Sequence, residues 1–289
     1  MVRMGTSELD TSMLRAFKGA CGAVLRDFAA STSSFKLVRT VSHAISPHAT
    51  AARTLYVLDG SFNPPTKAHH RIATSAFSEL DGSAPRRLLL LLATQNADKA
   101  TKPASLEDRL LMMTLFAHEL LYDVKQQFPL LIDVGLVKQP YFHDKATAID
   151  ESGVYPGTLQ QVHLIGFDTL VRIFNTKYYP PDHNLRVLEP FLSKHRLRTT
   201  NRTDDEWGDR QEQEHYIQDI ADGKRDDEGA RREWARQLTL VEGRQEGEDV
   251  VSSTLARAAA RNSPAQLDKY VMPTVRDWIV SERLYLKDE

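Results

Sequence analysis

The chain has 289 residues, of which 37 are basic and 39 acidic, so its formal charge at neutral pH is −2. This length can bury one large α/β core or two smaller ones. Its 41% hydrophobic and 26% charged residues are close to the average of folded proteins, which excludes a disordered tail protein. Without an excess of Lys and Arg, we expect no nucleic-acid partner, and any phosphate binding must come from a local site.

The sequence predicts neither a membrane span nor a disulfide. No apolar run approaches the roughly 18 residues that cross a bilayer, and the longest strongly apolar stretch, residues 88–93, has the length of a strand. The single cysteine, Cys21, cannot form an internal disulfide, which favours a reducing compartment. We therefore expect a soluble protein of the cytoplasm, or of the cytoplasm and nucleus.

Residues 1–50 are open to two interpretations. They are rich in Ser, Thr and Ala with scattered Arg, as mitochondrial transit peptides are, but Glu8, Asp10 and Asp27 interrupt them and such peptides are poor in acids. Apolar residues also recur at helical spacing, namely Leu14, Phe17, Val24, Leu25 and Phe28. We therefore expect a helical lead-in packed on the core, and a mitochondrial location is disfavoured.

Strand and helix patterns alternate through residues 51–192. Short apolar runs predict strands at residues 54–58, 87–93, 130–134 and 161–165. Amphipathic segments predict helices over residues 68–80, 105–121 and 167–174. The second of these helices begins with Ser105 and Asp108, a pair that resembles a capping box. Such alternation predicts an α/β fold with a Rossmann-like, doubly wound parallel sheet.

Residues 193–249 interrupt this pattern. About half of them are Asp, Glu, Lys or Arg, mixed in sign and with few aliphatic residues between. This composition predicts a charged insertion, helical or partly disordered, to which we assign no chemistry. We expect its aromatic residues Trp207 and Trp234 to dock it on the core.

Ordered structure is expected to resume near residue 249. Residues 249–251 resemble a strand, a helix follows from Ser252 or Ser253, and an amphipathic helix covers residues 273–284. We therefore assign residues 51–192 and 250–289 to one α/β domain.

The segment most specific for a chemistry follows the first predicted strand. Its turn consists of Gly60, Ser61, Phe62, Asn63 and Pro64. The next helix begins near Ala68, so backbone N–H groups, the positive end of the helix dipole and His69 can face one anion. The loop lacks the Gly-Lys-Ser/Thr ending of a P-loop, and it does not match the dinucleotide fingerprint either.

A second anion-binding motif is predicted about 190 residues later. Ser252, Ser253 and Thr254 open a predicted helix, where Ser and Thr side chains cap the first turn and leave N–H groups exposed. Arg257 lies one turn into this helix and can lean back over the same anion. The motif alone is an ordinary helix cap, but its place after the first motif favours a shared site.

These two motifs resemble the signatures of the nucleotidylyltransferase superfamily. Residues 60–64 match Gly-Ser/Thr-Phe-Asp/Asn-Pro, and Thr66 and His69 match its continuation His/Thr-x-Gly-His, in which Ala68 replaces the usual glycine. The second motif is similar to Ile-Ser-Ser/Thr-Thr-x-x-Arg. Within the superfamily, residues 54–192 and 250–286 resemble fungal nicotinamide mononucleotide adenylyltransferase-like proteins.

The resemblance implies a set of site residues. It makes His69, Lys99 and Arg257 catalytic. It places ATP at Gly60, Ser61, Phe62, Asn63, Thr66, His69, Gly166, Asp168, Ser252, Ser253, Thr254 and Arg257. It places the acceptor substrate at Asn96, Lys102 and Arg109.

The reaction that the resemblance implies is transfer of AMP from ATP to nicotinamide mononucleotide, which forms NAD and pyrophosphate. The acceptor phosphate is the nucleophile, so the enzyme has only to position the substrates and neutralise charge. Mg²⁺ is expected to bind through the ATP phosphates, with no protein metal site, because the histidines are too scattered to act as ligands.

Four alternatives stay open at this point. A cytidylyltransferase for a phosphorylated head group shares the first motif, although its second motif differs. An ATP hydrolase or a non-catalytic nucleotide-binding protein of the same fold is compatible with Thr66 and Ala68. An interaction protein would act through the charged segment. The oligomeric state is equally open, and a homo-oligomer is one of the options.

Overall fold

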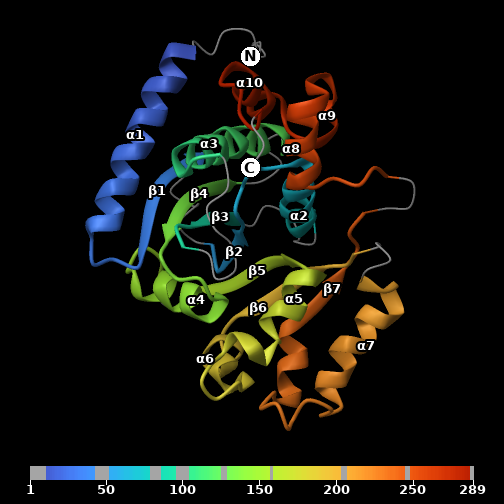
Figure 1. Cartoon of the computed structure of the whole chain (residues 1–289). Coiled ribbons are helices and arrows are strands. Elements are labelled where there is room, and N and C mark those ends of the chain that lie inside the picture. Colours follow the sequence, from blue (N-terminus) through green and yellow to red (C-terminus); the bar gives the residue numbers. More distant parts are fainter. Residues whose placement is uncertain are drawn as a thin grey trace.

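The computed structural model describes residues 11–42, 52–78, 86–95, 104–124, 129–156, 159–202, 207–244 and 248–286. Within these residues a seven-stranded sheet forms the centre, in the order β1-β4-β3-β2-β5-β6-β7 (Figure 1). The strands are β1 (Phe35–Ser42), β2 (Thr54–Asp59), β3 (Arg86–Ala93), β4 (Leu130–Val137), β5 (Gln160–Gly166), β6 (Arg196–Thr200) and β7 (Leu238–Val241).

The order of the strands reverses between β2 and β5. Strands β3 and β4 extend the sheet on one side of β2, and β5, β6 and β7 extend it on the other, with every one of these neighbours parallel. Among the described strands, only β1, at the edge, pairs in the antiparallel sense. This is the doubly wound arrangement predicted from the alternation of strands and helices, and it opens a crevice at the carboxyl ends of β2 and β5.

Helices cover the sheet on both faces (Figure 1). They are α1 (Thr11–Ala30), α2 (Lys67–Ser78), α3 (Leu106–Asp123), α4 (Phe142–Glu151), α5 (Phe167–Ile173), α6 (Glu189–Leu192), α7 (Arg210–Ala221), α8 (Ser253–Asn262), α9 (Leu267–Tyr270) and α10 (Pro273–Ser281). None of these described helices is long and apolar enough to cross a bilayer.

Successive side chains of the central strands pack into the cores on opposite faces of the sheet. In β3, Leu88 and Leu90 face the helices α1, α3, α8 and α10, whereas Leu89 and Leu91 face α4. All four side chains are fully buried. A strand covered on both faces has no solvated side, which explains why β3 is a continuous apolar run in the sequence.

The expected helix near the N-terminus is present as α1, and it packs on α3. Its buried residues include Cys21, Leu25 and Phe28, and burial raises the pKa of the Cys21 thiol to about 11. The strand that follows, β1, was not predicted. It is an edge strand with one solvent-facing side, so its residues do not form an apolar run.

Residues 193–249 differ from the expected insertion. They contain the predicted helical element, α7, but also β6 and β7, which extend the central sheet. Leu197, Ile220 and Trp234 belong to a second apolar core with Phe174. The Trp234 ring lies 6.3 Å from that of Phe174, so the docking predicted for this tryptophan is confirmed. The strands are too short and too polar to stand out in a charged segment.

The strand expected at residues 249–251 was wrong. These residues make no strand pairing, and Val250 is 45% exposed. The edge of the sheet beside β6 is already occupied by β7, which ends at Val241. Residues 248–252 instead lead into α8, and Ser252 lies at the crevice.

Candidate active site

A pocket of about 840 Å³ opens at the carboxyl ends of β2 and β5. In a doubly wound sheet this is where the strand order reverses and where ligands bind. Of the predicted site residues, those that line the pocket are Gly60, Ser61, Thr66, His69, Gly166, Asp168, Ser252 and Ser253. The pocket therefore joins three sequence segments that were predicted separately.

The loop after β2 is held by contacts within the fold. Phe62 is fully buried with a φ of 44°, a conformation that bulky residues rarely adopt. The Asn63 side chain is 5% exposed, and its Oδ1 accepts hydrogen bonds from the Ala104 N–H at 2.7 Å and the Tyr285 hydroxyl at 2.9 Å. Phe62 and Asn63 shape the loop and do not line the pocket, and their predicted contact with ATP stays a prediction.

His69 is held in one orientation by Thr66. Its Nδ1 accepts a hydrogen bond from the Thr66 backbone N–H at 3.0 Å and lies 2.8 Å from the Thr66 hydroxyl. The neutral ring must then carry its proton on Nε2. Burial lowers the pKa of His69 to about 4, so the ring is neutral near pH 7. Nε2 lies on the side of Gly60, where a Cβ would be 3.6 Å away. His69 thus presents a fixed N–H donor to the loop.

The second motif contacts the first directly. Ser252 caps α8 by accepting a hydrogen bond from the Leu255 N–H at 3.2 Å. The Ser253 hydroxyl donates to the Pro64 carbonyl at 2.8 Å, which joins the start of α8 to the loop after β2. The predicted convergence of two motifs about 190 residues apart is therefore present in the structure.

Two residues of that motif lie beside the pocket. Arg257 Nη1 donates to the Asn63 carbonyl at 2.8 Å, and its Nη2 lies 3.3 Å from the Thr254 hydroxyl. Thr254 is exposed, Arg257 is half-buried, and neither lines the pocket. Arg257 is therefore placed on the loop, with its guanidinium next to the mouth of the crevice.

Gly166 ends β5 and is the N-cap of α5, and Asp168 lies in the first turn of that helix. A Cβ at Gly166 would lie 2.7 Å from Asp168 Oδ1, so a side chain at this position would displace the carboxylate. The Asp168 side chain is 17% exposed at the pocket, and its Oδ1 accepts hydrogen bonds from Arg202 Nε at 3.1 Å and Nη2 at 2.9 Å. The carboxylate is thus held at the crevice.

The structure describes only one of the three predicted acceptor residues, Arg109, and it does not describe the predicted catalytic residue Lys99. Asn96, Lys99 and Lys102 lie outside the described residues. Arg109 is 3% exposed, and its Nε donates to the Ala104 carbonyl at 2.8 Å. Arg109 does not line the pocket, and its contact with the acceptor stays a prediction.

Residues 57–136 match the protein family described as Cytidylyltransferase-like. A Schizosaccharomyces pombe protein named "Putative nicotinamide mononucleotide adenylyltransferase" is 30% identical over 256 residues, which cover 86% of this chain and 90% of that protein. The chain belongs to the cytidylyltransferase-like family of nucleotidylyltransferases. The family predicted from the two motifs is thereby confirmed.

Solved structures share the nucleotidylyltransferase fold. Two structures of Plasmodium falciparum nicotinic acid mononucleotide adenylyltransferase, complexed with NaAD and with APC, match with TM-scores of 0.52 and 0.51. Each covers 81% of this chain and 97% of its own, at 15% sequence identity. At this identity the match concerns the fold, and it confirms the predicted fold class.

Several residues of the nucleotidylyltransferase pocket were not predicted. The cations among them are Arg71, Arg172, Lys177, Arg202 and Arg244. These cations come from different elements and share no sequence motif. The position of Arg202 just after a strand could have indicated a place at the pocket, but that strand, β6, was not predicted. Asp59, which ends β2 and lines the pocket, pairs with Lys145 of α4 at 2.5 Å.

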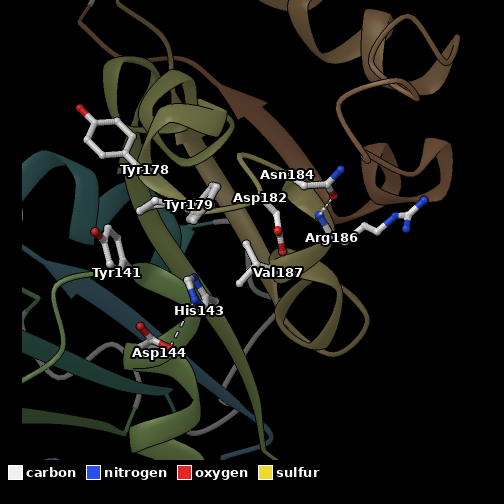
Figure 2. Close-up of a pocket in the computed structure, with 10 residues that line it drawn as sticks. Tyr141, His143, Asp144, Tyr178, Tyr179, Asp182, Asn184, Arg186 and Val187 are labelled. Carbon is white, nitrogen blue, oxygen red and sulfur yellow. Dashed lines mark hydrogen bonds and ion pairs between the residues drawn. The ribbon is translucent and has the colours of Figure 1, made fainter.

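Figure 2 shows the residues around a second pocket, of about 710 Å³. It adjoins the first pocket and shares Tyr141, Tyr178 and Tyr179 with it. The ring of His143 is parallel to that of Tyr141, at 6.0 Å and 12°, and is 5.7 Å from that of Tyr179. The Tyr179 hydroxyl donates to the Ile173 carbonyl at 2.6 Å, which fixes its ring. The nucleotidylyltransferase crevice therefore continues into an aromatic recess that suits a flat ring.

The described residues contain no group of three or more His, Cys, Asp or Glu side chains placed to hold a metal ion. Around the loop and the start of α8, the groups at the pocket are N–H groups, hydroxyls and His69. These groups suit the oxygens of a polyphosphate.

Proposed function

We propose that the protein transfers AMP from ATP to nicotinamide mononucleotide and releases pyrophosphate. The observation that carries this proposal is the contact between the two motifs, through Ser253 and Pro64 and through Arg257 and Asn63, at the edge of one pocket. The name of the Schizosaccharomyces pombe relative supports nicotinamide mononucleotide as the acceptor. NAD is the product of this transfer.

In the proposed reaction, a phosphate oxygen of the mononucleotide attacks the α-phosphorus of ATP. The new phosphorus–oxygen bond forms as the bond from the α-phosphorus to the bridging β-phosphate oxygen breaks, and pyrophosphate leaves with that electron pair. No side chain acts as nucleophile, so catalysis consists of positioning and charge stabilisation. His69 Nε2–H, the N–H groups that begin α2 and α8, and Arg257 supply the donors.

A preorganised donor of this kind stabilises a transition state by about 3 kcal/mol. His69 suits the role because its proton stays on Nε2 over the physiological pH range, given its pKa of about 4. Mg²⁺ would be held by the phosphate oxygens and water, and it would neutralise charge on the triphosphate.

We place the nucleotide ribose at Asp168, whose carboxylate can accept hydrogen bonds from hydroxyl groups. The acceptor's ring would occupy the aromatic recess beside Tyr141, His143 and Tyr179. Support for this placement is the continuity of the two pockets through Tyr141, Tyr178 and Tyr179. A dinucleotide product can then span the crevice from one pocket to the other.

The test is release of pyrophosphate from ATP and Mg²⁺ with and without nicotinamide mononucleotide, together with chromatographic detection of NAD. We expect release that depends on the mononucleotide. Phosphate release from ATP alone would identify a hydrolase, and no turnover with intact ATP binding would identify a binding protein. Pyrophosphate release from CTP with phosphocholine would instead identify a cytidylyltransferase for a phosphorylated head group.

A further inference from the structure

Helix α7 of the charged segment contains one polar side chain that is fully buried. Gln213 is 0% exposed, although its neighbours Glu212 and Glu214 are exposed. Its Oε1 accepts a hydrogen bond from the Arg202 N–H at 3.0 Å, and its Nε2 donates to the Gly208 carbonyl at 3.2 Å and to the Arg202 carbonyl. A buried amide is stable only when such bonds are made. Gln213 therefore fixes the chain that leaves β6.

Arg202 is the residue that this amide holds. Both backbone polar groups of Arg202 bond to the Gln213 side chain, so its backbone cannot rotate without breaking both bonds. Arg202 follows the last residue of β6, Thr200, by two positions and lines the main pocket. The buried amide of α7 thus determines where the guanidinium of Arg202 enters the pocket.

The guanidinium in turn holds Asp168. Arg202 Nε and Nη2 both donate to Asp168 Oδ1, at 3.1 Å and 2.9 Å. Asp168 Oδ2 has no partner among the residues that the structure describes. Two donors on one oxygen fix the rotation of a carboxylate, and the absence of a Cβ at Gly166 leaves room for that oxygen. The second oxygen is left to accept a hydrogen bond within the pocket.

We propose that Arg202 is a positioning residue for nucleotide binding and that α7 holds it in place through Gln213. Arg202 and α7, both from the charged segment, then belong to the nucleotide site. The proposal rests on the proposed function in one respect, which is the assignment of Asp168 to the nucleotide. Because the Arg202 side chain is 42% exposed, its ion pair adds little to folding, and its removal should affect binding more than stability.

The first test titrates ATP into Arg202→Ala and Arg202→Lys by calorimetry, without acceptor. We expect Arg202→Ala to weaken ATP binding about tenfold, as loss of a charge-assisted hydrogen bond does. Arg202→Lys should fall between it and the wild type, because an ammonium lacks the planar fork. The matched control is Arg232→Ala, which removes an exposed ion pair with Asp226 in the same segment and should bind ATP as the wild type does.

A double-mutant cycle separates positioning from direct contact. If Arg202 acts through Asp168, Arg202→Ala in the Asp168→Asn background should weaken ATP binding by less than twofold beyond Asp168→Asn alone. Full additivity of the two losses would mean that Arg202 contacts the nucleotide by itself, and this would overturn the proposal.

The role of α7 is tested with two glutamines of the same helix. Gln213→Ala should weaken ATP binding about as much as Arg202→Ala does, whereas Gln218→Ala, which removes only an exposed bond to Asp222, should not. If Gln213→Ala does not fold, Gln213→Glu keeps the shape and the Oε1 acceptor and is titrated in its place. Wild-type ATP affinity in a folded Gln213 variant would contradict the role of α7.

These titrations use ATP alone, so their outcome is separate from that of the transfer assay. A wild-type protein that binds ATP but makes no NAD would contradict the proposed function and would leave the positioning test intact. Wild-type ATP affinity in the Arg202 variants would end the positioning proposal and leave AMP transfer untouched.

Discussion

Arg257 Nη1 donates a hydrogen bond to the backbone carbonyl of Asn63 at 2.8 Å, across 194 positions of sequence. This bond places a guanidinium of α8 on the loop that begins at the end of β2. From there the side chain can reach a phosphate bound at the two motifs. We expect Arg257→Ala to weaken ATP binding by about 2 kcal/mol or more, and Arg257→Lys by less, because Lys keeps the charge without the fork. Calorimetric titration of ATP measures both.

The control for Arg257 is Arg261→Ala, one turn further along α8, where the side chain bonds the Tyr285 carbonyl. It should retain wild-type ATP affinity. Thermal melts of all variants separate binding from folding. If Arg257→Ala binds ATP as tightly as the wild type, the second motif has no part in nucleotide binding.

We expect His69 to contribute to catalysis rather than to the stability of the fold. His69→Ala should lower turnover by about a hundredfold or more with little change in melting temperature, because it removes a preorganised donor from the developing charge. Steady-state kinetics with ATP and nicotinamide mononucleotide test this. The neighbouring His70, which faces Asp123 at 3.1 Å, provides the control variant His70→Asn. A drop in melting temperature at unchanged specific activity would refute the assignment.

Two histidines with lowered pKa values predict how stability depends on pH. Burial lowers the pKa of His69 to about 4 and that of His163 well below its usual range. An unfolded histidine titrates near 6.5, so between pH 6.5 and 4 the unfolded chain binds protons that the folded chain does not. The free energy of unfolding should therefore fall as the pH is lowered through this window.

Denaturant unfolding of the wild type and His69→Asn at several pH values measures this effect. Near pH 5 the slope of the unfolding free energy against pH should be smaller in the variant by about 1.4 kcal/mol per pH unit, the value for one proton. Identical slopes would show that His69 is protonated in the folded protein at that pH.

The ion pair between Asp59 and Lys145 is nearly buried, with side chains 9% and 5% exposed and a separation of 2.5 Å. Lys145→Met leaves the Asp59 carboxylate without its partner, and breaking such a pair costs about 3–5 kcal/mol. We expect this loss of stability in urea unfolding. The double variant Asp59→Asn with Lys145→Met should recover part of it, because no unpaired charge remains. Equal stability of Lys145→Met and the wild type would mean that water or another cation compensates the carboxylate.

The central part of this fold could be predicted from the sequence because its signals are local. Strands β2 to β5 are apolar runs, since both faces are covered by helices, and the helices between them follow the spacing of their buried side. The loop at Gly60 and the cap at Ser252 depend on the backbone and on short polar side chains. Such motifs can be recognised in the sequence without knowing which distant residues surround them. The two motifs and their order were therefore sufficient to predict the family and the meeting of both at one site.

Only the tertiary structure decided the edges of the sheet and the roles of individual polar residues. Strands β1, β6 and β7 are short or half-solvated, so they are not apolar runs, and pairing with distant strands is what makes them strands. Whether Asn63 and Arg109 face solvent, ligand or core depends on partners such as Ala104 and Tyr285. A polar side chain can be buried when distant residues form hydrogen bonds with it, and the spacing of residues in the sequence does not predict those bonds.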